Sequence, residues 1–169
     1  MDWIVDGIRR ALELLFGLDP QVLGITLLSL QVSAIATGLS LLIGLPLGTV
    51  LALGQFPSRR FWISLVNTGM ALPPVVVGLV VSILLWRSGP LGSLKLMYTP
   101  LAIIIAQTVI AAPVVTGLTI SALQSLNPRL RMQLYGLGAS RLQTIWLLWR
   151  EARLPLLAAL MAGFGSVIS

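Results

Sequence analysis

The side chains that could do chemistry within the apolar stretches of this chain are neutral amides and hydroxyls. Groups of this kind can line a polar path through apolar surroundings, or they can hydrogen-bond one helix to the next. The sequence leaves both interpretations open for the following residues: Gln31, Ser33, Thr37, Asn67, Thr68, Ser82, Gln107 and Thr108.

The residue types that enzymes use most often are missing from these stretches. The chain has no cysteine and no histidine, which removes thiol nucleophiles, thiolate metal sites and imidazole acid–base groups. Four of the five acidic residues precede residue 20, so no carboxylate pair is left for a metal ion or a hydrolytic reaction. No phosphate-binding loop of the Gly-x-x-x-x-Gly-Lys-Ser/Thr type occurs. We therefore expect no enzyme, no catalytic residue, no metal site and no cofactor.

The composition is that of a protein whose solvent is lipid. Hydrophobic residues make up 57% of the chain and charged residues 9%, whereas about a quarter of an ordinary soluble domain is charged. The net charge of +6 could indicate nucleic-acid binding or the excess of Lys and Arg in cytoplasmic loops of membrane proteins. The basic residues lie between apolar stretches and form no long run, so we favour the loops and expect no nucleic-acid partner.

The hydrophobicity pattern predicts an all-α, polytopic membrane helical bundle with three full spans and a partial fourth. About 20 apolar residues cross a bilayer as a helix. The predicted spans are residues 21–54, 61–86, 98–123 and 154–169, with a loop over residues 124–153. An amphipathic segment over residues 1–19 precedes this membrane domain of residues 20–169, and it either lies in the membrane interface or packs on a partner. The last stretch is short for a crossing, so we expect the chain to be cut within a helix.

Glycine and proline mark special points inside the spans. Gly44 and Gly48 are four residues apart, which suits close helix contact, and Pro46 between them removes a helix hydrogen bond. Pro73-Pro74 interrupts the second span, and Gly78 follows four residues later. Such a break is tolerated where protein or a water-filled cavity covers it, so it indicates either a pathway lining or a structural kink. No ionisable residue lies within the first three spans, which argues against a proton relay.

The loop over residues 124–153 holds five of the eleven basic residues and predicts a helix–turn–helix. Asn127 and Pro128 suit a helix start, Gly138 suits a left-handed helix end, and Ser140 with Gln143 suits a capping box. The predicted apolar stripes are Leu126, Leu130, Leu134 and Leu137 on the first helix, and Leu142, Ile145, Trp146 and Trp149 on the second. The loop could receive a protein partner or lie on anionic lipid.

Because the loops 55–60 and 124–153 carry most basic residues, the positive-inside rule places them in the cytoplasm and the N-terminus outside.

The turn of this loop resembles a known motif. Leu137, Gly138, Ala139 and Ser140, followed by Arg141, resemble the coupling loop of type I ABC importer permeases. Residues 67–78 and 88–92 are similar to segments of oxyanion permeases, and residues 150–153 with 162–165 to the tungstate-type branch. Where the family's coupling motif begins Glu-Ala-Ala, this chain has Met132-Gln133-Leu134, which lacks the acidic contact with the ATPase.

The resemblance implies the membrane-spanning permease subunit of an ATP-binding-cassette importer in the cytoplasmic (inner) membrane. The transported solute would be a small oxyanion, with tungstate first and molybdate or sulfate as alternatives. The implied partners are a second copy of the chain, an ABC ATPase subunit docked at Leu137–Arg141, an extracytoplasmic substrate-binding protein and membrane lipid. Residues expected to line the path are Asn67, Pro73, Pro74 and Gly78. A membrane scaffold subunit without an ATPase partner is the alternative of a different class.

Overall fold

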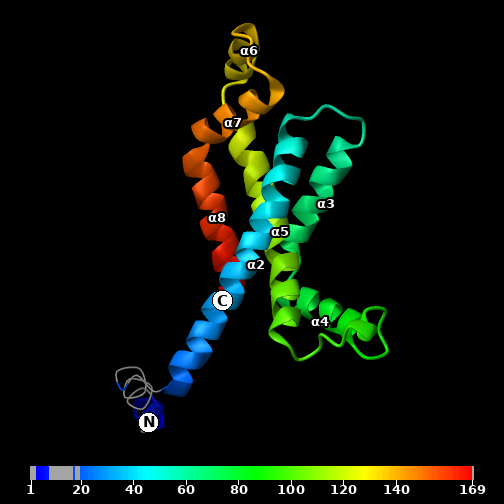
Figure 1. Ribbon diagram of the computed structural model, residues 1–169, viewed down its shortest axis with the longest axis vertical. Coiled ribbons are helices and arrows are strands. Elements are labelled where there is room, and N and C mark those ends of the chain that lie inside the picture. Colours follow the sequence, from blue (N-terminus) through cyan, green and yellow to red (C-terminus); the bar gives the residue numbers. More distant parts are fainter. Residues whose placement is uncertain (1–2, 8–16, 18–19, 169) are drawn as a thin grey trace.

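The computed structural model describes residues 3–7, 17 and 20–168, and every regular element in these residues is helical (Figure 1). The elements with defined bounds are α2 (Pro20–Leu53), α3 (Arg59–Ala71), α4 (Pro74–Leu85), η1 (Gly92–Leu94), α5 (Pro100–Gln124), α6 (Pro128–Gly136), α7 (Arg141–Glu151) and α8 (Arg153–Ile168). The expected all-α fold is confirmed for this part of the chain. The amphipathic segment expected over residues 1–19 lies largely outside the described residues.

The core is formed where α2, α5 and α8 pack side by side. Val115 of α5 is fully buried between two glycines, Gly44 of α2 and Gly163 of α8. A Cβ atom on Gly44 would lie 2.7 Å from Cγ1 of Val115, and a Cβ atom on Gly163 would lie 2.7 Å from its Cγ2. One turn along, a Cβ on Gly48 would lie 2.6 Å from Cβ of Thr119. The close contact expected at Gly44 and Gly48 is therefore confirmed, and α5 is its partner.

Two helices, α2 and α5, are by themselves long and apolar enough to cross a membrane. Two further pairs qualify only when each pair is taken as one broken segment. The helices α3 and α4 meet at a bend of 100°, and α7 and α8 at a bend of 74°. Residues 61–86, expected as one interrupted span, are therefore two helices, and α4 runs across the bundle while α3 runs along it (Figure 1).

The bend between α3 and α4 follows from two consecutive prolines. A residue that precedes proline is driven out of the α region, because the proline ring collides with its backbone. Leu72 precedes Pro73, and Pro73 precedes Pro74. Both Leu72 (ψ 130°) and Pro73 (ψ 133°) are accordingly extended. Pro74 then begins α4, where its missing N–H costs nothing.

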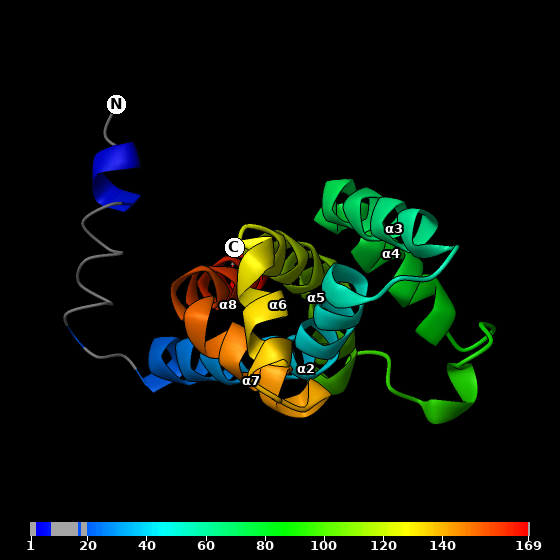
Figure 2. The same cartoon turned by 90° about the horizontal axis from the view of Figure 1, so that it is seen from above.

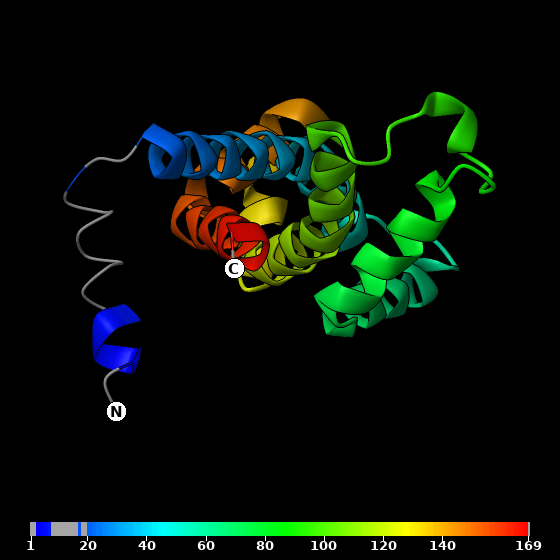
Figure 3. The same ribbon diagram turned by 90° about the horizontal axis from the view of Figure 1, so that it is seen from below.

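The two ends of the molecule differ in what covers them. The views along the bundle show α2, α5 and α8 grouped together with α3 and α4 to one side (Figures 2 and 3). One end is covered by α6 and α7, and the opposite end carries α4 and the loop before α5 (Figure 1). We refer to these as the α6–α7 end and the α4 end.

Candidate functional site

The turn between α6 and α7 has the local structure expected from its residues. Gly138 has φ +81°, which is the left-handed conformation that glycine adopts without a steric cost. Its N–H donates to the carbonyl of Tyr135 at 3.0 Å, and the N–H of Ala139 donates to the carbonyl of Leu134 at 3.0 Å. These two bonds are a Schellman motif, which satisfies the last carbonyls of α6.

The next helix begins with the predicted capping box. The N–H of Gln143 donates to Oγ of Ser140 at 3.3 Å, and the N–H of Ser140 donates to Oε1 of Gln143 at 2.8 Å. Asn127 likewise caps α6 by accepting a hydrogen bond from the N–H of Arg129. The turn is therefore fixed on both sides, and it holds Leu137 with 85% of its surface exposed at the tip of the molecule.

Arginine side chains tie this end of the molecule to α2. Nε of Arg59 donates to the carbonyl of Leu51 at 2.6 Å, and its Nη2 donates to that of Ala52 at 3.3 Å. Nη1 of Arg131, in α6, donates to the carbonyl of Leu53 at 2.9 Å. The last carbonyls of a helix have no partner within it, and the guanidinium charge complements the negative end of the helix dipole. The end of α2 is thus held by α3 and by α6.

A second tie joins α7 to α2. Nε1 of Trp149 donates to Oγ1 of Thr49 at 2.9 Å. Next to Trp149, Leu148 of α7 and Ala152, the residue after α7, are buried against Leu123 of α5. The helix that follows the α6–α7 turn is therefore joined to both α2 and α5. Sequence reasoning missed Arg59, Arg131 and the Thr49–Trp149 pair.

The apolar stripes predicted for this loop are correct in part. Leu126, Leu130 and Leu134 pack against the buried cluster, but Leu137 is exposed. On α7 the prediction is also correct in part, because Trp149 packs against the same cluster and Ile145 is half-buried. Leu142 and Trp146 are 79% and 59% exposed, whereas Thr144 and Leu148, which the stripe did not include, are buried. Thr144 tolerates burial because its hydroxyl donates to the carbonyl of Ser140 at 2.9 Å, so its polar group costs little.

The candidate path residues lie on α3, at the proline break and on α4. Asn67 is exposed on α3, and Ser64 and Thr68 are exposed near it on the same helix. Pro73 and Pro74 form the 100° bend. Gly78 lies beyond it on α4, with open space where a side chain would be. No described contact brings these residues together around one point.

Other neutral polar residues of the spans have partners within their own helix or on a neighbouring one. Ser33 and Thr37 are buried, and the Thr37 hydroxyl donates to the Ser33 carbonyl at 2.7 Å. Nε2 of Gln107 donates to the carbonyl of Val167 at 2.9 Å, which joins α5 to α8. Oε1 of Gln107 is buried without a partner in the described part of the chain.

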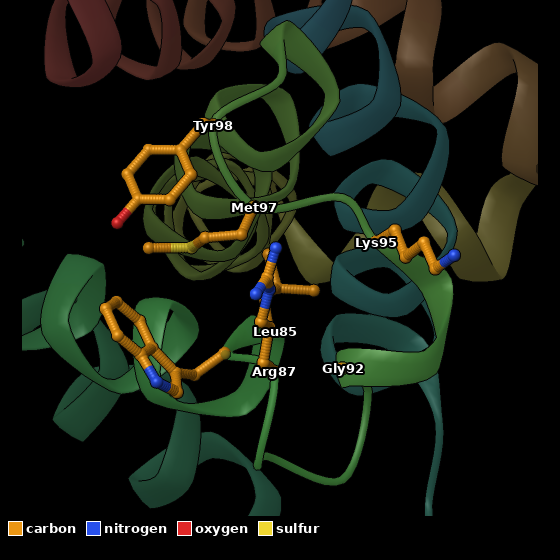
Figure 4. A pocket seen from close by; sticks show the side chains of 7 residues that line it. Leu85, Arg87, Gly92, Lys95, Met97 and Tyr98 are labelled. Atoms are coloured by element: carbon orange, nitrogen blue, oxygen red, sulfur yellow. The ribbon is translucent and has the colours of Figure 1, made fainter.

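A cavity of about 810 Å³ lies at the α4 end. It is lined by Leu85, Trp86, Arg87, Gly92, Lys95, Met97 and Tyr98. The Arg87 side chain extends into the middle of this group toward Met97, whereas Lys95 points away from it (Figure 4). Two lining residues have left-handed backbone, Lys95 (φ 51°) and Tyr98 (φ 67°), a conformation that is uncommon outside glycine. Sequence reasoning did not single out this cavity.

The described residues contain no group of three or more His, Cys, Asp or Glu side chains that could hold a metal ion.

Comparison with known proteins decides the family. Residues 44–169 match the family described as "Binding-protein-dependent transport system inner membrane component". The chain belongs to this family. It is the membrane-spanning permease component of an ABC transport system, and it spans the membrane with helices of the kind described above.

Relatives of known name match over most of this permease. The tungstate uptake system permease protein TupB of Peptoclostridium acidaminophilum is 39% identical over 169 residues, which is all of this chain and 74% of that protein. The TupB protein of Campylobacter jejuni is 32% identical over 169 residues, covering 71% of its own length. A probable anion ABC transporter permease protein of Haloferax volcanii is 40% identical over 148 residues, which are 88% of this chain and 64% of that protein.

Proposed function

We propose that this permease imports a small oxyanion, tungstate first, as a homodimer driven by a separate ABC ATPase. The observation that carries the substrate assignment is the similarity along the whole chain to two tungstate uptake permeases. The relative from Haloferax volcanii is named only for anions, so another oxyanion, such as molybdate or sulfate, is the second candidate.

The docking site for the ATPase is the turn Leu137, Gly138, Ala139, Ser140 and Arg141. Its tip is exposed, its backbone is fixed by two caps, and the two helices around it are hydrogen-bonded to α2. A docking element needs this combination, because a flexible turn would absorb the motion that it has to transmit. In place of the family's Glu-Ala-Ala start, this chain has Met132 and Gln133 exposed on α6. Neither side chain offers the acidic contact, so contact with the ATPase would rest on the turn itself.

The polar face of α3 and the proline break are the proposed path. Exposed Asn67 would be poorly placed against lipid tails, which offer no hydrogen bonds, but it suits a water-filled path between two copies of the chain. The Thr68 hydroxyl donates to the Ser64 carbonyl at 3.0 Å, so Thr68 is compatible with either environment. Pro73 and Pro74 keep the backbone bent, and Gly78 leaves open space beside α4. An extracytoplasmic binding protein would deliver the anion at the α4 end, where the Arg87 side chain extends into the cavity (Figure 4). The outer apolar faces of the spans would contact membrane lipid.

Reconstitution tests this function directly. The full-length permease is purified in detergent, co-purifying proteins are identified by mass spectrometry, and the complex is placed in proteoliposomes with its binding protein. We expect an ATPase to co-purify and ATP to drive uptake of tungstate in preference to sulfate, measured as metal or sulfur content. A folded permease that recovers no ATPase would instead support the scaffold alternative.

A further inference from the structure

A groove of about 480 Å³ opens on the surface where α2, α7 and α8 meet. Its walls are almost entirely apolar and consist of Leu41 and Leu45 on α2 and Leu156, Leu157 and Leu160 on α8, with Trp146, Trp149, Arg150 and Arg153 at its rim. The described residues leave the groove open, since Trp146, Leu157 and Leu160 are all exposed.

The charged rim and the apolar walls are at opposite ends of the groove. Arg150 ends α7 and Arg153 begins α8, at the bend of 74°. From there the wall on α8 runs through Leu160, which is about 10 Å away along a helix with a rise of 1.5 Å per residue. On α2 the wall runs from Leu45 to Leu41, away from the α6–α7 end. The groove therefore leads from two cations into the apolar part of the bundle.

Among the described residues, no carboxylate is paired with either guanidinium group. In the described part of the chain no ion pair involves Arg150 or Arg153. Glu151 lines a neighbouring pocket that Arg150 and Arg153 also line, but it does not line this groove. The guanidinium of Arg150 lies 5.7 Å from the ring centroid of Trp146, which orients it at the rim without cancelling its charge.

Aromatic residues and cations gather at one depth of the bundle. Trp is enriched where the hydrocarbon core meets the headgroups, and basic pockets between membrane helices on the cytoplasmic side suit anionic headgroups. Trp146 and Trp149 lie at this level beside Arg150 and Arg153, and Trp149 is fixed by its hydrogen bond to Thr49.

We propose that this groove is a binding site for an anionic phospholipid, with the phosphate between Arg150 and Arg153 and an acyl chain along α2 and α8. Charge complementarity favours an anionic lipid over a zwitterionic one, and the length of the apolar wall favours a lipid over a soluble phosphate. A lipid in this place touches α7 and α2 together. It therefore reinforces the connection that the Trp149–Thr49 hydrogen bond makes.

The test measures lipid binding itself and does not depend on which solute is transported. The full-length permease, in complex with its ATPase, is titrated with phosphatidylglycerol or phosphatidylcholine and monitored by native mass spectrometry. The test variant is Arg150→Gln/Arg153→Gln. The matched control is Arg60→Gln/Arg129→Gln, which removes two exposed charges from the same end of the molecule. Arg150→Lys/Arg153→Lys keeps the charges.

We expect the wild type to prefer phosphatidylglycerol. The preference should fall about 5-fold for each charge removed, or about 25-fold in the test variant, because a basic residue near an anionic surface is worth about 1 kcal/mol. The control and the lysine variant should keep it. Glycerol phosphate, which has the headgroup without acyl chains, should not compete.

Three results would overturn the proposal. The first is equal binding of the two lipids by the wild type, which would also be seen if another protein segment filled the groove in the complex. The second is an equal loss in the test variant and in the control. The third is competition by glycerol phosphate, which would reduce the site to two surface cations. Loss of uptake with intact lipid binding, in contrast, would count against the proposed function alone.

Discussion

At the scale of single residues, the last three carbonyls of α2 are held by two arginines from different parts of the chain. Arg59 reaches two carbonyls with one planar guanidinium, and Arg131 reaches the third. Arginine suits this role because its donors point in fixed directions, whereas the lysine ammonium is a compact point charge. The consequence is that α6, which carries the proposed docking turn, is bonded to the end of a membrane span.

The Trp149–Thr49 hydrogen bond should stabilise the packing of α7 on α2 by about 1 kcal/mol. Trp149→Phe keeps most of the aromatic surface and removes the donor, and Thr49→Val removes the acceptor. The two substitutions should therefore be non-additive in a double-mutant cycle of thermal or denaturant unfolding in detergent. Strictly additive effects would mean that the two side chains do not interact in the membrane protein.

Gly138→Val should uncouple ATP hydrolysis from uptake. Valine in the left-handed region costs about 1–2 kcal/mol, although no atom within 4 Å would collide with its Cβ. The damage is therefore to the backbone of the turn and not to packing. The measurement is the ratio of anion imported to ATP hydrolysed in proteoliposomes.

Gly136→Val is the matched control for this substitution. Gly136 is equally open but lies in α6, where valine is acceptable. An unchanged ratio in Gly138→Val, or an equal loss in both variants, would remove the turn from the coupling mechanism.

Sequence reasoning predicted the caps at Asn127, Gly138 and Ser140 because each depends on residues within a few positions. It missed the Arg131–Leu53 and Trp149–Thr49 bonds, whose partners are 78 and 100 positions apart. Such pairs exist only after the helices have packed. An arginine shortly after a long apolar helix, as Arg59 is, was the one local signal for a carbonyl cap.

At the scale of elements, the double proline divides what would otherwise be one span. Pro73→Ala/Pro74→Ala should let α3 continue into α4, since Leu72 would be free to adopt helical angles. The chain has no cysteine, so spin labels at Ser64→Cys and Leu84→Cys report one distance. In a continuous helix these 20 residues span about 30 Å, and in the bent pair they are markedly closer.

We therefore expect the labelled distance to lengthen in the double-alanine variant, and the import rate to fall. Pro74→Ala alone is the control, because Leu72 still precedes a proline and should stay extended. An unchanged distance in the double variant would show that packing against α5 sets the bend and the prolines only accommodate it.

The existence and limits of the helices could be read from the sequence, but their directions could not. Runs of apolar residues between Arg, Gly and Pro give α2 and α5 within a few positions. The double proline predicts a break but not the 100° angle, and Gly69 also lies close to Pro113 of α5, a contact that periodicity does not contain. The apolar stripe of α7 was predicted correctly only in part, for a related reason. Hydrophobicity favoured Leu142 and Trp146, but the cap at Ser140 and the turn into α8 present Thr144 and Leu148 to the bundle.

At the scale of the whole molecule, charge is distributed unevenly between the two ends. Of the described basic residues, those at the α6–α7 end are Arg59, Arg60, Arg129, Arg131, Arg141, Arg150 and Arg153, and those at the α4 end are Arg87 and Lys95. The fold brings the two basic loops together at one end, as the bond from Arg131 to Leu53 shows. By the positive-inside rule, we propose that the α6–α7 end faces the cytoplasm, which would give an ATPase access to the proposed docking turn.

This orientation predicts which residues a membrane-impermeant maleimide can reach in cells with an intact inner membrane. The single-cysteine variant Ser93→Cys, in η1 near the cavity of the α4 end, should be labelled from outside. The variants Ser58→Cys and Gln133→Cys, both exposed at the α6–α7 end, should be labelled only after the membrane is opened. Each variant carries a single thiol, so the label reports one position. Labelling intact and opened cells in the same experiment shows that each thiol is able to react. The reverse pattern would put the docking turn outside the cell and away from ATP, so that neither the coupling role of Gly138 nor the import direction could hold.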